Sequence, residues 1–317
     1  MHAPGTKNLT RLLAALLLSM AAFTSAQGQA PVQTPAVATA KPEYRVQPLR
    51  TGLYLLQGGG GNVVLWAAPD GVLLIDDGTA AAAPQLIEAI GRITHAPVRF
   101  VVNTHWHPDH TGGNEALARS GAVILAHESV RERLAIPQPV EETESRSPVA
   151  PAVALPLVTF ATSAALHLAG DRVDLVHVAD AHSDGDVVAR WATANVVAVG
   201  DLYWNAGYPF IELASGGSLP GVVAALEAIL ARADGQTLVI PGHGAIATRA
   251  ELAAYRDMLV AVGKRVRAAV EQGQSVEEVL AAHPTAEFDE RYGRGGATPE
   301  RFVRTLYREF AGGRSAR

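Results

Sequence analysis

The 317-residue sequence contains no cysteine. This absence excludes disulfide bonds, thiolate zinc sites and cysteine nucleophiles together, so any metal must be held by His and Asp side chains. The sequence also has no basic run: 26 Lys and Arg stand against 31 Asp and Glu, which gives a net charge of −5. A nucleic-acid partner is therefore not expected, whereas a small-molecule substrate drawn to a local metal charge fits the composition.

The N-terminal segment has the pattern of an export signal. Lys7 and Arg11 form a positive start, residues 12–23 are apolar, and small residues follow up to Ala26. The apolar stretch is too short for a membrane span, which needs about twenty residues. Without a cysteine there can be no lipoprotein anchor. We predict a cleaved signal peptide at residues 1–26 and a periplasmic or secreted protein with no stable membrane insertion.

Two blocks of strands and helices follow a linker at residues 27–43, which is rich in Ala, Pro, Gln and Thr and is expected to be disordered. Strands are expected at residues 46–49, 53–57, 62–67, 72–75, 98–103, 122–126, 165–168, 172–178, 187–191, 196–199 and 238–240. Helices are expected at residues 86–93, 115–120, 128–135 and 219–231. This order predicts an α/β (α+β) fold of two sheets packed face to face with helices outside, a four-layer αβ/βα sandwich.

The sandwich is expected to form a catalytic domain over residues 44–247. Residues 248–317 are predicted to form a helical C-terminal extension, with apolar positions at helical spacing in three segments: 252–270, 276–281 and 299–310. Residues 137–156 carry no apolar period and are expected to run over the surface.

Four consecutive glycines at residues 58–61 do not form a phosphate-binding loop. No Gly-Lys-Ser/Thr ending and no helix follows them, and no acidic residue lies at dinucleotide spacing. We expect this loop to be a mobile flap at the rim of a pocket.

Residues 104–113 carry the strongest chemical signal in the sequence. His105, His107, Asp109 and His110 lie within six positions, directly after an apolar strand. Neutral nitrogen and hard oxygen donors at this density are what a borderline cation such as zinc requires. A purely structural histidine cluster is a poor alternative, since the rings would repel when protonated and need several separate partners when neutral.

Three further residues lie directly after buried strands, where a metal ligand is expected. They are His182, Asp201 and His243, and the last of these lies between two glycines that allow close approach of the backbone. His167 and His177 fall inside apolar strand patterns, where a metal ligand is not expected. Since strand ends gather at one edge of a sandwich, we expect all seven side chains to meet there.

With these residues in place, the sequence resembles the metallo-β-lactamase superfamily of zinc hydrolases. The HxHxDH motif is present as His105-Trp106-His107-Pro108-Asp109-His110, followed in the family's order by the three later residues. The resemblance implies the metallo-β-lactamase sandwich fold and two Zn²⁺ per chain, with iron or manganese less expected. It assigns His105, His107 and His182 to the first metal, Asp109, His110 and His243 to the second, and Asp201 to both.

The resemblance also implies that Asp76 supports the histidines of the first metal from outside the ligand set. Two cations with a shared water would let a hydroxide attack an amide, lactone, ester or thioester carbonyl, with Asp109 as the catalytic residue that orients it. We expect Trp204, Asn205, Tyr208 and Phe210, which follow Asp201, to line the substrate pocket, although ordinary packing explains them equally well.

Three functions remain open from the sequence. The favoured one is an exported dinuclear zinc hydrolase; β-lactam turnover is possible, although the lactamases of the superfamily usually present cysteine or a non-ligand at the position of Asp201. An iron-dependent oxidoreductase of the persulfide dioxygenase type is the second, and a non-catalytic metal-binding protein is the third. The sequence does not indicate an oligomeric state.

Overall fold

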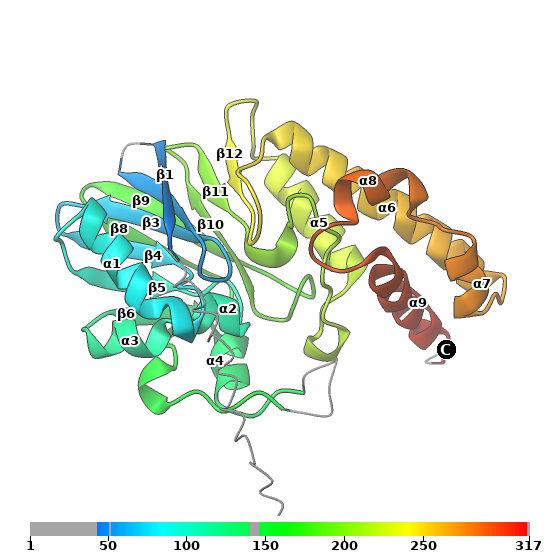
Figure 1. The fold of residues 1–317 in the computed structure, drawn as a ribbon, viewed down its shortest axis with the longest axis horizontal. Helices are drawn as coiled ribbons and strands as arrows, with labels where there is room; N and C mark the ends of the chain where they lie inside the picture. The colour runs from blue at the N-terminus through cyan, green and yellow to red at the C-terminus, as the bar shows by residue number, and fades with distance from the viewer. Residues whose placement is uncertain (1–42, 51, 140–145, 316–317) are drawn as a thin grey trace, which may run out of the picture. The chain divides into compact units, whose positions relative to one another are not determined.

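The computed structural model describes residues 43–50, 52–139 and 146–315 (Figure 1). The predicted signal peptide at residues 1–26 and nearly all of the predicted linker lie outside this part of the chain. Among the described residues, no helix combines the length and the apolar character that crossing a membrane would require.

The first sheet has seven strands in chain order, β1 to β7. They are β1 (Arg45–Arg50), β2 (Leu53–Gln57), β3 (Val63–Ala68), β4 (Gly71–Ile75), β5 (Val98–Val102), β6 (Val123–His127) and β7 (Val158–Phe160). Strands β1 to β4 pair antiparallel, and β4 to β7 pair parallel. The predicted strands of this half are all present; β7 is an addition, too short to give a periodic pattern.

The second sheet has five strands in the order β12-β11-β10-β9-β8. They are β8 (Ser163–Leu168), β9 (Asp171–Val178), β10 (Asp186–Trp191), β11 (Val196–Ala198) and β12 (Leu238–Ile240). Strands β11 and β12 are parallel and are joined through helix α5 (Leu219–Leu230), while the other pairs are antiparallel.

Side chains on the two faces of each sheet form separate apolar layers. Along β4, Leu73 and Ile75 face the second sheet, while Val72 and Leu74 face helices, as the period of two in a strand requires. Trp66 and Trp191 meet edge to face between the sheets, with ring centroids 6.2 Å apart. The four-layer αβ/βα sandwich predicted from the sequence is confirmed.

The helices beside the first sheet are short. They are α1 (Ala83–Ile93), α2 (Pro108–Thr111), α3 (Asn114–Arg119) and α4 (Glu128–Leu134). Single 3-10 turns occur at Ala80–Ala82, Ala152–Ala154, Gly200–Leu202, Leu213–Ser215 and Ala286–Phe288. Helices α1 and α3 pack on the outer face of this sheet, and the predicted helix at residues 128–135 is α4.

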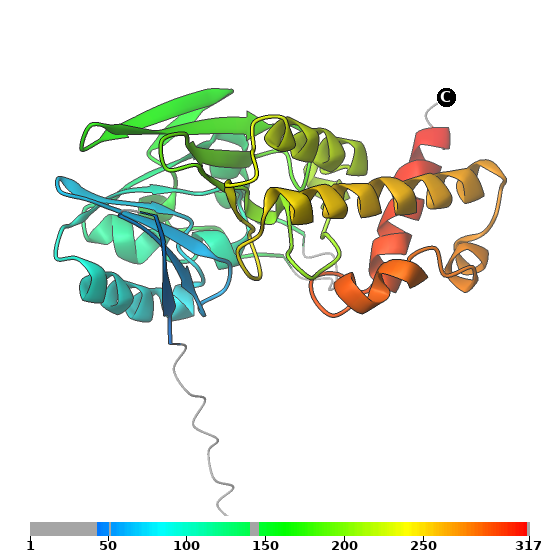
Figure 2. The same ribbon diagram turned by 90° about the horizontal axis from the view of Figure 1, so that it is seen from above.

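The C-terminal extension consists of four helices: α6 (Arg249–Glu271), α7 (Val276–Ala281), α8 (Asp289–Tyr292) and α9 (Pro299–Ser315). Helix α6 begins at a capping box formed by Thr248 and Glu251, and packs against both α5 and α9 (Figure 2). Buried residues from both sides of position 247 share one apolar core. The boundary predicted there therefore lies inside a continuous core.

Candidate metal centre

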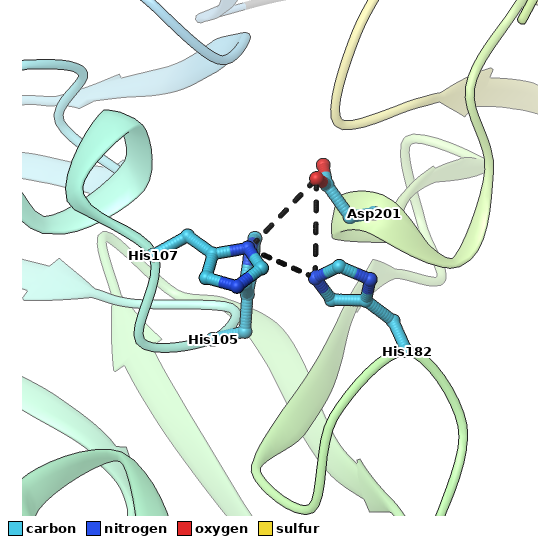
Figure 3. A group of neighbouring side chains, drawn as sticks. All are labelled: His105, His107, His182 and Asp201. Carbon is cyan, nitrogen blue, oxygen red and sulfur yellow. Dashed lines mark hydrogen bonds and ion pairs between the residues drawn. The ribbon is translucent and has the colours of Figure 1, made fainter. Parts of the chain in front are cut away.

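Three imidazole nitrogens converge beyond the carboxyl end of β5. His107 Nδ1 is 3.1 Å from His105 Nε2 and 3.1 Å from His182 Nε2. Asp201 follows β11 in the other sheet, and its Oδ2 is 3.8 Å from His105 Nε2 and 4.0 Å from His182 Nε2 (Figure 3). These four residues, the first ligand group, are buried except for the partly exposed His107.

A second ligand group lies beside the first and shares Asp201 with it. His110 Nε2 is 3.2 Å from His243 Nε2, and Asp109 Oδ2 is 3.1 Å from His243 Nε2. The other oxygen of Asp201, Oδ1, is 3.2 Å from His110 Nε2 and 3.5 Å from His243 Nε2. The structure thus brings together all seven side chains that the sequence singled out.

The spacing within each group suits a small cation. A tetrahedral zinc ion with bonds of about 2.0–2.1 Å to nitrogen would hold its ligand atoms about 3.3 Å apart. Most of the separations above are close to this value. Asp201 Oδ1 is also buried and makes no hydrogen bond of acceptable geometry with the described residues, despite its short distance to His110. A cation would satisfy that oxygen.

Three residues of the first ligand group have pKa shifts that suit metal ligands, which must be unprotonated to bind. Burial, followed by the charge of His107, lowers the pKa of His182 to about 4, and burial holds the pKa of His105 well below its usual value. Burial raises the pKa of Asp201, but His110 and His243 outweigh it, so this pKa lies well below the ordinary range. His105 and His182 are therefore neutral imidazoles, and Asp201 is a carboxylate, at neutral pH.

Each histidine of the first group is oriented by an oxygen behind it. Thr104 Oγ1 donates to Asp76 and accepts from His105 Nδ1 at 3.0 Å. His107 Nε2 donates to Glu212 Oε2 at 3.1 Å. Such partners fix the tautomer of a ligand histidine, so that its other nitrogen faces the cation.

The same arrangement continues at His182 and His110. The backbone carbonyl of Phe210 accepts from His182 Nδ1 at 2.6 Å. Asp76 Oδ2 accepts from His110 Nδ1 at 2.8 Å, and Asp76 reaches the first group only through Thr104. Asp76 therefore supports His105 of the first group indirectly, as expected, and it also holds His110 of the second group directly, which the sequence did not indicate.

The glycines near the centre allow close packing. A Cβ at Gly61 would overlap the ring of His110, and Gly61 N donates to Asp109 O at 3.0 Å. The Gly61 end of the glycine loop is therefore packed against the second ligand group, whereas Gly58 and Gly60 are exposed, and movement of the loop as a flap stays a prediction. A Cβ at Gly242 would overlap Asp201 Oδ1, which confirms the role expected for the glycines around His243.

An open cavity of about 320 Å³ lies over the two groups. Asp109 and Asp201 line this cavity, and so do Trp204 and Phe210. The ring of Trp204 stacks on that of His243, with centroids 3.9 Å apart. The two other expected pocket residues do not line it. Tyr208 is fully buried, and its hydroxyl donates to Asp289 Oδ1 at 2.7 Å. Asn205 Nδ2 donates a hydrogen bond to the carbonyl of Ala245.

Glu212 and Arg301 are among the cavity residues that the sequence did not indicate. Glu212 lies in a loop far along the chain from His107, and no local pattern marks it. Arg301 lies in the first turn of α9, in the C-terminal extension, and reaches the cavity from there. Neither residue has a sequence signal that could have identified it without the fold.

The remaining histidines and aspartates near His182 have structural roles. His177 stacks on His127 with centroids 3.6 Å apart, and its Nδ1 lies 3.0 Å from the carbonyl of Asp186. The side chain of Asp186 accepts from the backbone and hydroxyl of Ser183, which closes the turn after His182. The preference for His182 as the ligand candidate agrees with this geometry.

The fold and the site together define a class of protein: an αβ/βα sandwich with a His/Asp metal-binding cluster at the rim of its sheets. Residues 56–244 match the family model described as the metallo-β-lactamase superfamily. Because this match covers more than half of the chain, the chain belongs to that superfamily.

Similar proteins include one curated sequence and several solved structures. A hydroxyacylglutathione hydrolase of Anaeromyxobacter dehalogenans (strain 2CP-C) is 30% identical over 180 residues, which are 56% of this chain and 59% of that relative. The chain therefore spans well under two thirds of that protein. The sec-alkylsulfatase Pisa1 from Pseudomonas sp. aligns with a TM-score of 0.63 and 17% identity, over 85% of this chain and 50% of its own.

A smaller neighbour marks the extent of the sandwich. The metallo-β-lactamase from Pontibacter korlensis aligns with a TM-score of 0.55 and 20% identity, over 68% of this chain and 99% of its own. At these identities the structural matches establish the fold and not the reaction.

Proposed function

We propose that this chain is an exported dinuclear zinc hydrolase that cleaves an amide, lactone, ester or thioester bond. The observation that carries the proposal is the position of Asp201, whose two oxygens face two separate ligand groups. A carboxylate shared in this way is suited to two cations held close together. The names of the similar proteins, a hydroxyacylglutathione hydrolase and a sec-alkylsulfatase, support hydrolysis without choosing the bond.

The donor set fits zinc. His105, His107, His182 and Asp201 would hold one cation, and Asp109, His110 and His243, together with Asp201, would hold the other. When bound, such a pair of cations supplies Lewis acidity, lowering the pKa of water to about 7 and polarising a carbonyl.

The chain's own residues supply orientation. Asp109 lines the cavity, and its side chain is 33% exposed. Its carboxylate can therefore hold the attacking water and accept its proton. Asp76 and Glu212 keep the ring nitrogens of His110 and His107 aimed inward. Trp204 covers His243 and restricts water at that side of the cavity.

The test is metal analysis combined with a hydrolysis panel on zinc-loaded protein. The panel contains a chromogenic cephalosporin, a lactone, a glutathione thioester and a secondary alkyl sulfate. Because the chain has no cysteine, a thiol reagent would report only the thiol released from the thioester. The proposal predicts carbonyl hydrolysis that a chelator abolishes and zinc restores. Iron in protein purified without added metal, or silence on every substrate, would contradict it.

A further inference from the structure

Phe210 places an aromatic ring beside the first ligand group in the cavity. Its ring centroid is 5.8 Å from that of His107 and 6.1 Å from that of His182, and the residue is half-buried. Asp109, which can hold the attacking water, belongs to the second ligand group. A carbonyl attacked from that side lies toward the first ligand group, so a group attached to its carbon comes close to Phe210.

The position of Phe210 is fixed by the residues around it. Its carbonyl accepts from His182 Nδ1 at 2.6 Å, and the next residue, Ile211, is buried in the core that includes the C-terminal extension. The backbone N–H of Glu212 donates to the carbonyl of His182 at 3.0 Å. The guanidinium of Arg301 covers the ring, with its carbon 4.3 Å from the ring centroid. Phe210 therefore offers a preformed apolar surface, whose use in binding costs little conformational entropy.

The charged side chains in the described lining of the cavity are already engaged. Asp109 and Asp201 belong to the ligand groups, Glu212 accepts two hydrogen bonds, and the guanidinium of Arg301 lies over an aromatic ring. A charged substituent placed against Phe210 would lose its water without gaining a partner of opposite charge, which is costly. An apolar substituent gains free energy from the same contact. The apolar and aromatic side chains of this lining include Trp106, Pro108, Trp204, Phe210 and Ala297.

We propose that Phe210 forms a subsite for an apolar acyl group of the substrate, beside the first ligand group. The substrate class is then a carbonyl compound whose acyl group is aromatic or branched aliphatic and carries no charge. The cavity of about 320 Å³ has room for a group of this size. This inference rests on the proposed function, because the scissile carbonyl is placed over the ligand groups.

The test uses three hydroxamic acids, which share one zinc-binding group and differ in the acyl group attached to it. Binding of acetohydroxamic acid, phenylacetohydroxamic acid and 4-carboxyphenylacetohydroxamic acid to the full-length zinc-loaded protein is measured by calorimetry. The wild type should bind the phenylacetyl probe about 10- to 100-fold more tightly than the acetyl probe, and the carboxylate should remove most of this gain. Phe210→Ala should lose about 10-fold in affinity for the phenylacetyl probe and little for the acetyl probe, and Phe210→Leu should recover part of the loss.

The matched control is Phe288→Ala. Phe288 is also half-buried and also has a guanidinium over its ring, that of Arg265 at 5.6 Å, but it lies outside the described cavity lining. Its loss should leave all three affinities unchanged. A wild type without preference for the phenylacetyl probe, a carboxylate probe that binds more tightly, or Phe210 variants that keep the full preference would overturn the subsite. Because the assay measures binding alone, failure of the subsite is distinguished from failure of the hydrolase proposal, which the hydrolysis panel reports.

Discussion

Glu212 provides a sharp test of how the first ligand group is held. Its Oε2 accepts from His107 Nε2 and from Trp106 Nε1, both at 3.1 Å, and the residue is 4% exposed. Burial raises the pKa of Glu212, but the hydrogen bond and charge of His107 outweigh it, so the pKa stays below its ordinary value. The side chain is therefore a buried carboxylate at neutral pH.

Replacing Glu212 by Gln keeps the shape of the side chain and one hydrogen-bond acceptor. It removes the negative charge that makes the other ring nitrogen of His107 a stronger ligand for a cation. Removal of such a partner costs about 10- to 100-fold in metal affinity, which corresponds to about 1.4–2.7 kcal/mol. We expect this loss in the binding of one zinc only. Glu212→Ala leaves two buried N–H donors without an acceptor and should also lower the free energy of unfolding by about 2–4 kcal/mol.

The assay is a zinc titration in competition with a chromogenic chelator, with the two binding steps assigned by His243→Ala, which removes a member of the second ligand group. The control is Glu227→Gln, an exposed carboxylate 3.3 Å from Arg256, which should bind zinc as the wild type does. Unchanged zinc affinity in Glu212→Gln, or an equal loss in both binding steps, would show that Glu212 does not specifically support the first ligand group.

Four further substitutions, the first with a matched control, test other parts of the structure. Gly242→Ala should lower the free energy of unfolding by about 1–3 kcal/mol and weaken zinc binding, because its Cβ overlaps a ligand carboxylate; Gly91→Ala, where a Cβ meets no atom within 4 Å, should be neutral or slightly stabilising in the same denaturant titration. Asp76→Asn should weaken the second zinc step about 10- to 100-fold, and an effect confined to the first step would contradict this. Asp109→Asn should reduce kcat more than it reduces affinity for the first zinc; equal losses would argue against an orienting role. Tyr208→Phe should cost about 1 kcal/mol in unfolding without changing KM, whereas a raised KM would return Tyr208 to the pocket.

The seven residues of the His/Asp cluster could be predicted because the pattern that marks them is local in the sequence. Donor residues crowd into residues 104–113, and His182, Asp201 and His243 each stand alone after an apolar strand, where little except chemistry explains them. The fold could be predicted for a similar reason. Successive side chains along strands such as β4 face alternately the inner and the outer apolar layer of the sandwich.

The surroundings of the ligands could not be predicted in the same way. Glu212 is 105 residues from His107 in the sequence, and only the packing of the two halves brings them together. The aromatic side chains after Asp201 fit either a pocket or a core, and the C-terminal extension decides between them by burying Tyr208 and leaving Trp204 in the cavity. The contact of the glycine loop with His110 likewise depends on the tertiary structure and could not be predicted from the sequence.

The most direct test of the central claim is a crystal structure of the zinc-loaded protein with anomalous scattering measured at the zinc edge. We expect two anomalous peaks about 3.5–4 Å apart, with one oxygen of Asp201 directed at each peak. A single peak, or two peaks of which one lies away from Asp109, His110 and His243, would contradict it.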